Sequence, residues 1–491
     1  MRALYCGGGF IDSQILWLLP IIDGYCKKNK IETLIFERKL SQIILKKKIS
    51  SNILKKYKII YLKNELNFLK IFNIIFFILK NSFLMIYYSV KVERKILLKK
   101  KISWEKSQIF HSIWDTSFFY LKDGDLTPSF FQKLKASVRV FLNIHLAHSI
   151  KSIHTAFLGH SVYTARALTA IFRKFNIKIF MHGSCVIHYL PKTYDISSSF
   201  VSRKILYNIK RSNLKNIALK YWRMRLRGFS TYADARMAFQ SKIVKKENCN
   251  FSNVIMLHIF RDSPFNIIDR ERIFEDYVSW ISNTLKILKD SNEDWLIRPH
   301  PGFNRWGENS FETYLKIYKG VFGENPCKNV KYMSDKLSNI DILKSAKRVI
   351  TFNGTSHIEA ACFGIKPIVI SDCTLSHLSQ SLVFKPKSYS EYSGLLLKNS
   401  HSSTFKLSKN KVEYAKFALF AKENITTLAT DLKSNPVYRG DGQNIKIREF
   451  NNVSRNLKNK ELFLTQTGSL LGSKFKTTIS EKYLKYFNFN Q

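Results

Sequence analysis

The second half of the chain alternates short apolar runs with helical segments. Strand-like runs at Val254–Phe260, Trp295–Arg298 and Arg348–Phe352 are each followed by a polar turn and a helix-like segment. Apolar residues recur at helical spacing between the first two runs: Ile273, Phe274, Tyr277, Val278, Ile281, Leu285 and Leu288. Strands that alternate with helices build a parallel sheet covered on both faces. The sequence therefore predicts an α/β fold with a doubly wound, Rossmann-like sheet here.

The first half shows the same alternation more faintly, in residues 1–37 and 155–183. A chain of 491 residues is also too long for one ordinary core. We therefore predict two Rossmann-like domains facing a cleft. The first spans residues 1–245 on the acceptor side, with a basic and apolar helical insertion at about 40–110. The second spans 250–430 and holds the donor, and residues 431–491 form a basic polar extension.

The charge of the chain is strongly unbalanced. Lys and Arg number 80 against 36 Asp and Glu, a net charge of +44, which attracts anionic lipid, nucleic acid or acidic glycan. The basic residues are dispersed and no aromatic-interleaved motif occurs, so nucleic acid is the less favoured partner. Seven cysteines without a Cys-x-x-Cys pair favour a reducing cytoplasm.

One stretch raises the question of a membrane. Phe68–Val90 is very apolar, but Lys70, Asn73, Lys80 and Asn81 interrupt it. No charge-free run reaches the ~18 residues that a spanning helix usually needs. The simpler interpretation is a core helix with solvated ends. The functional interpretation is a basic amphipathic patch on an anionic leaflet.

Polar loops follow three of the predicted strands in the second half. The first, Arg261–Phe265, contains Asp262. The second carries Arg298, followed by His300 between two prolines. The third begins after the strand at 348–352, and its candidate ligand-binding residues are Asn353, Gly354, Thr355, Ser356 and Glu359. Ligands of doubly wound sheets bind beyond the carboxyl ends of the strands. These loops are therefore expected to line one cleft.

The residue types in these loops suit a phosphate. Arg298 is a permanent cation, and His300 titrates near neutrality and can donate to a departing phosphate. The segment at 354–356 is predicted to begin a helix, where backbone N–H groups and hydroxyls can face an anion. An ordinary helix cap and a strand-ending turn are the structural alternatives. Two anion-binding features in one sheet favour a nucleotide-phosphate site.

The first half is expected to supply the acceptor side. Asp115, His160, Arg166 and His182 are its candidates, although no spacing ties them together and each can equally be structural. Asp123–Asp125, an Asp-Gly-Asp sequence, matches turn chemistry better than a metal motif. We therefore predict no metal site and no cofactor.

The second-half motifs resemble those of a known family. "RPHP" followed by "GTSHIEA…FGIKPIVISD", with "LHIFRDSPF…DYVSWI" before them, is similar to the bacterial capsule-polysaccharide biosynthesis glycosyltransferases. That family has the two-domain GT-B architecture and includes retaining β-Kdo transferases that use CMP-Kdo. The resemblance covers about residues 254–395. It implies that His300, Gly354, Thr355 and Glu359 hold the donor nucleotide, with Arg298 in place of the usual lysine.

The resemblance implies a metal-independent glycosyltransferase of bacterial surface polysaccharide, peripheral on the cytoplasmic side of the inner membrane. Its expected substrates are a nucleotide sugar, CMP-linked sugars first, and a glycan or glycolipid acceptor. One alternative is a glycerol-phosphate or phosphosugar transferase with the same donor half. Another is a non-catalytic protein that binds polyanions or membranes through its charge.

Overall fold

The fold is known from a computed structural model of the whole chain. The structure describes residues 1–6, 12–36, 48–61, 68–93, 97, 104–150, 152–159, 163–183, 186–189, 201–230, 251–262, 272–301, 309–324, 327–333, 338–425 and 428–429. His160, the glycine run at 7–9 and the extension at 431–491 lie outside these residues, as does the predicted domain boundary at residues 245–250.

The first sheet organises the N-terminal half. Its strands are β1 (Arg2–Cys6), β2 (Thr33–Phe36), β3 (Lys58–Tyr61), β4 (Thr155–Leu158), β5 (Lys178–Gly183), β6 (Val186–Tyr189) and β12 (Leu428–Ala429), in the order β12-β6-β5-β4-β1-β2-β3. Strands β1 to β5 pair in parallel, while β6 and β12 add antiparallel pairs at one edge. The helices are α1 (Asp12–Lys28), α3 (Lys48–Leu54), α4 (Phe68–Lys91), α6 (Trp104–Phe118), α7 (Phe130–Ser149) and α8 (Thr164–Lys174).

The second sheet is wholly parallel in the described residues. Its strands are β7 (Asn253–Met256), β8 (Trp295–Arg298), β9 (Val330–Tyr332), β10 (Arg348–Thr351) and β11 (Ile368–Val369), in the order β11-β10-β7-β8-β9. Its helices are α12 (Tyr277–Leu288), α13 (Ser310–Phe322), α14 (Asn339–Ser345), α15 (Ser356–Cys362), α16 (Thr374–Leu378), α17 (Tyr389–Leu397) and α18 (Lys409–Phe420). Short 3-10 turns at Gln380–Leu382 and Ser403–Phe405 and a π-helical turn at Ala421–Ile425 complete it.

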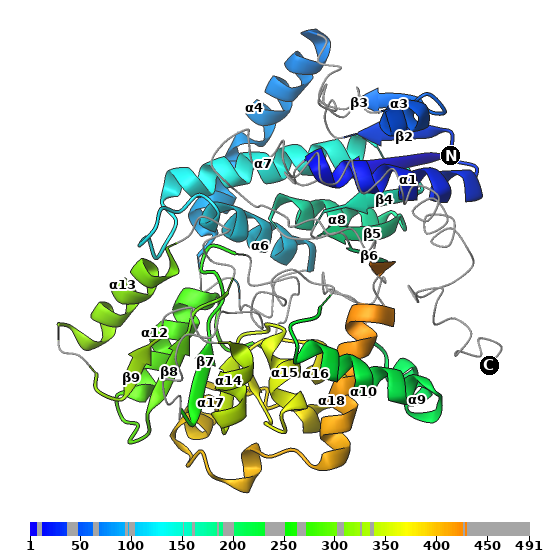
Figure 1. The fold of residues 1–491 in the computed structure, drawn as a ribbon. Coiled ribbons are helices and arrows are strands. Elements are labelled where there is room, and N and C mark those ends of the chain that lie inside the picture. Colours follow the sequence, from blue (N-terminus) through cyan, green and yellow to red (C-terminus); the bar gives the residue numbers. More distant parts are fainter. Residues whose placement is uncertain are drawn as a thin grey trace.

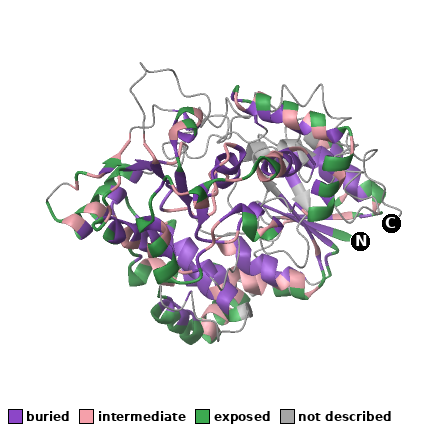
Figure 2. Ribbon diagram, turned by 90° about the horizontal axis from the view of Figure 1, so that it is seen from below, coloured by how far each residue is buried: buried purple, intermediate pink, exposed green. Residues whose placement is uncertain are grey.

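Both sheets share one strand order. Numbered within each half, the five parallel strands run 3-2-1-4-5, so the order reverses between β1 and β4 and again between β7 and β10. Figure 1 shows the two units one above the other, and in Figure 2 buried strands lie between helices whose outer faces are exposed. The predicted α/β fold with two Rossmann-like sheets is confirmed.

The two units are packed together and share chain. One cluster of buried apolar side chains runs from Phe110 and Trp114 of α6 to Ile255 of β7 and Tyr277 of α12. Helices α9 (Arg203–Arg211) and α10 (Leu214–Arg225) precede the second sheet in sequence but pack with α18 in another cluster. Strand β12 then returns to the first sheet. The division of the chain at residues 245–250 stays a prediction.

Helix α4 is not a core helix, so the simpler sequence interpretation is wrong. Its packed face consists mainly of Met85, Tyr88 and Ser89, which lie against α6 and α7, and Val92 just after the helix is also buried. The opposite face is exposed and apolar, with Phe72, Ile75, Phe76, Leu79, Phe83, Ile86, Tyr87 and Val90. Among the described helices, its segment Phe72–Lys91 is long and apolar enough to cross a membrane, judged by length and composition alone.

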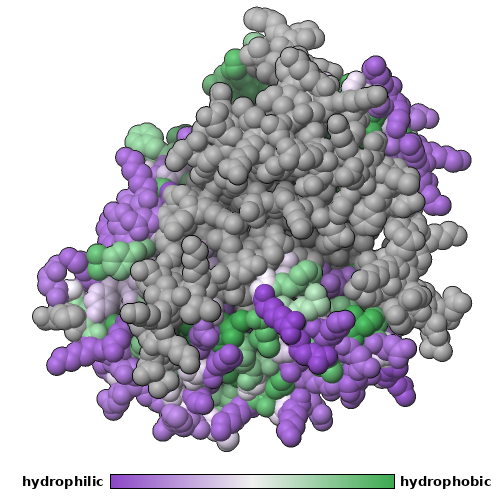
Figure 3. All heavy atoms as spheres, viewed as in Figure 1, coloured by the Kyte–Doolittle hydropathy of each residue, from purple (hydrophilic) through white to green (hydrophobic). Residues whose placement is uncertain are grey.

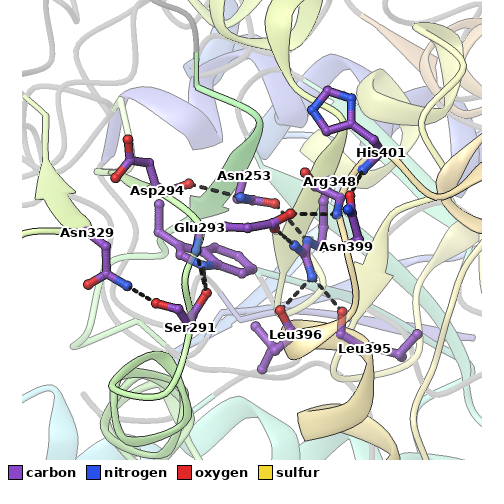
Figure 4. Close-up of polar contacts among 12 residues, drawn as sticks. Asn253, Ser291, Glu293, Asp294, Asn329, Arg348, Leu395, Leu396, Asn399 and His401 are labelled. Atoms are coloured by element: carbon purple, nitrogen blue, oxygen red, sulfur yellow. Dashed lines mark hydrogen bonds and ion pairs between the residues drawn. The ribbon is translucent and has the colours of Figure 1, made fainter.

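The amino-terminal end of β10 is anchored by a buried cation. The Arg348 guanidinium is fully buried, pairs with Glu293, and donates to the carbonyl oxygens of Leu395 (2.7 Å) and Leu396 (2.6 Å). Figure 4 shows these contacts converging on Arg348. A buried cation with several acceptors is stable where an unpaired one would not be. Through these bonds Arg348 connects α17 to the amino-terminal end of β10, opposite the loops at the carboxyl ends of the strands.

Candidate functional site

A cavity opens at the carboxyl ends of β7 and β10, where the strand order reverses. Its volume is about 210 Å³, and we call it the β7–β10 pocket. It is lined by Met256, Leu257, His258, Arg298, Pro299, His300, Pro301, Asn339, Thr351, Gly354, Thr355, Ser356 and Glu359. Crevices at such reversals are where open α/β sheets bind ligands. The volume is below the ~300 Å³ typical of whole small-molecule sites, so it suits one part of a larger ligand.

Two predicted residues enter the pocket from β8. Arg298 ends the strand and is buried, and His300 follows on a partly buried turn between Pro299 and Pro301. Each proline fixes its own φ, which limits how far this short segment can move. The structure therefore brings the cation and the imidazole together with the 354–356 loop, as the sequence predicts.

His258 is a pocket residue that the sequence reasoning missed. Its ring stacks on Tyr277 at 4.6 Å between centroids and lies 6.4 Å from the ring of His300. Its Nε2 is 3.3 Å from Thr351 Oγ1. Burial, with the nearby His300 and His357, lowers the pKa of His258 to about 3. The ring is therefore a neutral hydrogen-bonding group at pH 7.

The loop after β10 approaches His258 closely. A methyl group on Gly354 would lie 3.0 Å from the His258 ring and 3.2 Å from Thr351 Oγ1. Glycine is therefore needed here for close approach. Thr355 precedes α15, and its side chain makes no capping bond among the described residues. A side-chain cap at Thr355, one of the structural alternatives, is thus not formed, and Thr355 and Ser356 both line the pocket.

Glu359 lines the pocket but is tied inward. It is buried, and one carboxylate oxygen accepts from Arg225 of α10. The other accepts from Asn339 Nδ2 at 3.4 Å. Glu359 therefore belongs to a buried ion pair as well as to the pocket lining. A ligand hydroxyl would share an oxygen already in use.

Two further predicted donor residues lie beside the pocket lining. Asn353 is partly buried in the loop before Gly354. Asp262 accepts a hydrogen bond of 2.9 Å from the hydroxyl of Tyr163, a residue of the first unit. Neither contributes to the lining of the cavity. Asp262 instead joins the two halves of the chain.

The acceptor-side candidates are placed in different ways. Asp115 of α6 and Arg166 of α8 are both buried and form an ion pair of 3.1 Å, a contact that the sequence does not foretell. His182 lies on β5, and His160 is outside the described residues. Asp123, in the sequence taken as a turn, accepts from Arg261 at 2.9 Å. It thereby bridges the halves of the chain.

The pocket combines groups that can hold a phosphate ester. The lining includes a buried guanidinium, two imidazoles and the hydroxyls of Thr351, Thr355 and Ser356, and all are hydrogen-bond donors or can become so. The carboxylate of Glu359 and the amide of Asn339 stand on the same wall and can accept from or donate to hydroxyl groups. The arrangement fits a ligand with an anionic and a hydroxyl-bearing part.

No protein-family model and no curated protein matches the chain. Solved structures of distant similarity include the β-Kdo 2,4 transferase of Thermosulfurimonas dismutans KpsC, with 12% identity, a TM-score of 0.36, and 61% of this chain and 87% of that chain covered. The β-Kdo 2,7 transferase of the same protein has 15% identity and a TM-score of 0.33, over 73% and 98%. A putative UDP-N-acetylglucosamine 2-epimerase from Listeria monocytogenes has 10% identity and a TM-score of 0.28, over 98% and 99%. Similarity at this level assigns no activity.

The low pKa of His258 predicts a pH dependence of folding. The unfolded histidine titrates near 6.5, so below that pH the unfolded state binds a proton that the folded state rejects. The contribution of His258 to the free energy of unfolding is complete above pH 6.5 and is lost as the pH drops toward 3. Urea unfolding from pH 6 to 4.5 should show that His258→Gln removes about 1.4 kcal/mol per pH unit from the wild-type slope. The exposed His401→Gln is the control, and equal slopes in wild type and His258→Gln would refute the prediction.

Proposed function

We propose that the chain is a GT-B-type, metal-independent glycosyltransferase of bacterial surface-polysaccharide assembly. The observation that carries the proposal is the convergence of Arg298, His300, Thr355 and Ser356 at the crevice between β7 and β10. A nucleotide sugar would place its phosphate among these groups and its hydroxyls toward Glu359. CMP-linked sugars come first because the residues around His300 and Gly354 resemble those of the capsule-polysaccharide enzymes.

In this proposal Arg298 and His300 neutralise the charge that develops on the leaving phosphate. Donors held rigidly where charge develops stabilise a transition state more than a ground state. The buried position of Arg298 and the prolines around His300 provide that rigidity. The acceptor would enter from the first unit.

The experiment that tests the function is a thermal-unfolding panel with CMP, CDP, UDP and GDP. We expect a cytidine nucleotide to raise the melting temperature, because a ligand at a hundredfold excess over its dissociation constant adds about 2.7 kcal/mol to folding. Arg298→Gln should reduce the shift, whereas Lys331→Gln, an exposed change on β9, should not. Absence of any shift at millimolar nucleotide would refute the donor site.

A second prediction separates binding from turnover. His300→Ala should lower turnover by about a hundredfold, or ~3 kcal/mol, and weaken nucleotide binding much less, because its charge acts on the transition state. Turnover is measured as CMP release from CMP-Kdo with the glycolipid fraction of the producing bacterium as acceptor. Circular dichroism checks the fold. Unchanged turnover in a folded variant would leave the segment as a strand-ending turn.

We further propose that the chain is peripheral on the cytoplasmic side of the inner membrane and lies on an anionic lipid surface through α4. The helix has 24 residues, about 36 Å of length, and its exposed face is apolar. Lys80 and Lys91 are exposed beside that face and can reach lipid phosphates. Hydrophilic side chains instead rim the second unit in Figure 3. Figure 1 shows α4 at the end of the molecule away from this unit.

The membrane proposal predicts salt-sensitive binding to vesicles of phosphatidylcholine and phosphatidylglycerol. Phe76→Glu with Phe83→Glu should abolish co-sedimentation, because both side chains point outward, while Leu397→Glu on α17 should not. Raising the salt should weaken binding of the wild type. Equal sedimentation of wild type and double variant would contradict the use of α4. Release from membranes by detergent alone would indicate a spanning helix instead.

A further inference from the structure

A buried ion pair lies directly behind the β7–β10 pocket. Arg225, the last residue of α10, is fully buried and contacts the carboxylate of Glu359 on α15. The two residues are 134 positions apart in sequence. Glu359 itself lines the pocket, so the pair joins a helix outside the second sheet to the wall of the cavity.

The pair belongs to a cluster of buried charges. The carboxylate of Glu423, in the turn after α18, lies 4.0 Å from Arg225 Nη1 and accepts from Ser230 Oγ at 2.7 Å and from the Tyr221 hydroxyl. Lys422 is buried beside them, and its pKa is lowered by burial and raised by Glu423. Two cations therefore balance two carboxylates.

The Glu359 carboxylate has two opposite effects on a bound nucleotide. An anionic ligand beside Arg298 and His300 would be repelled by an uncompensated carboxylate at Glu359, which lines the same cavity. A carboxylate is nevertheless the strongest acceptor for a ligand hydroxyl. The contact with Arg225 cancels the charge of Glu359 toward the anion, and Asn339 holds its second oxygen at the cavity.

We propose that Arg225 is a positioning residue of the pocket, which holds the Glu359 carboxylate ready to accept a ribose hydroxyl of the bound nucleotide. This rests on the proposed nucleotide site. Arg225 does not line the cavity, so it acts through Glu359 rather than on the ligand. Loss of Arg225 exposes any anionic ligand to the Glu359 charge, but it weakens ligands that carry the hydroxyl more than those that lack it.

The chain contains a matched control. Arg348 is equally buried and also pairs with a glutamate, Glu293, but it sits at the amino-terminal end of β10 (Figure 4). The pocket lies at the carboxyl end of the same strand, at Thr351. Arg348→Gln breaks a buried ion pair without touching the pocket, so it measures the effect of lost stability alone.

The experiment compares dissociation constants of CMP and of 2′,3′-dideoxy-CMP by calorimetry. Arg225→Gln should weaken CMP binding about tenfold more than it weakens binding of the dideoxy nucleotide, while Arg225→Lys keeps CMP within about threefold. Arg348→Gln should leave both ligands unchanged. Arg225→Gln combined with Glu359→Gln should bind CMP as Glu359→Gln alone does, because the two residues act as one unit.

The outcomes separate the two proposals. If the wild type binds no nucleotide, the proposed function fails. If the wild type binds CMP but Arg225→Gln binds both ligands as Arg348→Gln does, Arg225 serves folding only and the inference is overturned. If Arg225→Gln does not fold, the double variant Arg225→Gln with Glu359→Gln, which lacks both charges, is compared with Glu359→Gln alone. Weaker CMP binding than in Glu359→Gln alone would show that Arg225 acts by another route.

Discussion

The arrangement of the site depends on β7 pairing in parallel with both β8 and β10. The chain leaves β7 toward one side of the sheet and later returns on the other, so the connections diverge beyond the strand ends. That divergence leaves a crevice beyond the ends of β7 and β10. His258 enters it from β7, Arg298 and His300 from β8, and Thr355 from the loop after β10. No one of these segments could form the pocket alone.

Two buried cations at the second sheet are stabilised by fixed ion pairs rather than by solvent. Arg348 and Arg225 are both buried guanidiniums, each paired with a glutamate. They differ in position, since one secures the amino-terminal end of β10 and the other backs the pocket wall. Removing one member of such a pair leaves a charge in a poorly solvated place, which is why buried pairs hold their surroundings in one geometry. Exposed lysines contribute to the positive charge as well, among them Lys289 and Lys331 of the second unit.

Sequence reasoning succeeded where the relevant signal is local. The alternation of strands and helices, the arginine and histidine of the 298–300 segment, and the glycine at 354 all follow strand ends that periodicity reveals. It missed His258 because that residue lies within the apolar run at 254–260, and the whole run was interpreted as a strand. Arg225 could not be found at all, since nothing near it in sequence indicates a glutamate 134 positions away. The sequence left open whether α4 is a core helix or lies on a surface, because apolar composition alone does not show what surrounds a helix.

The path of the chain makes the two units poor modules. The second sheet is covered in part by α10, which precedes it in sequence, and the chain finally crosses back to place β12 at the edge of the first sheet. A fragment cut at residues 250–430 would retain the strands of the second sheet but lose Arg225, leaving Glu359 without its cation. Exchange of this half between related chains by recombination would therefore have to carry α9 and α10 with it. The unit of inheritance is longer than the unit of folding that the sheet suggests.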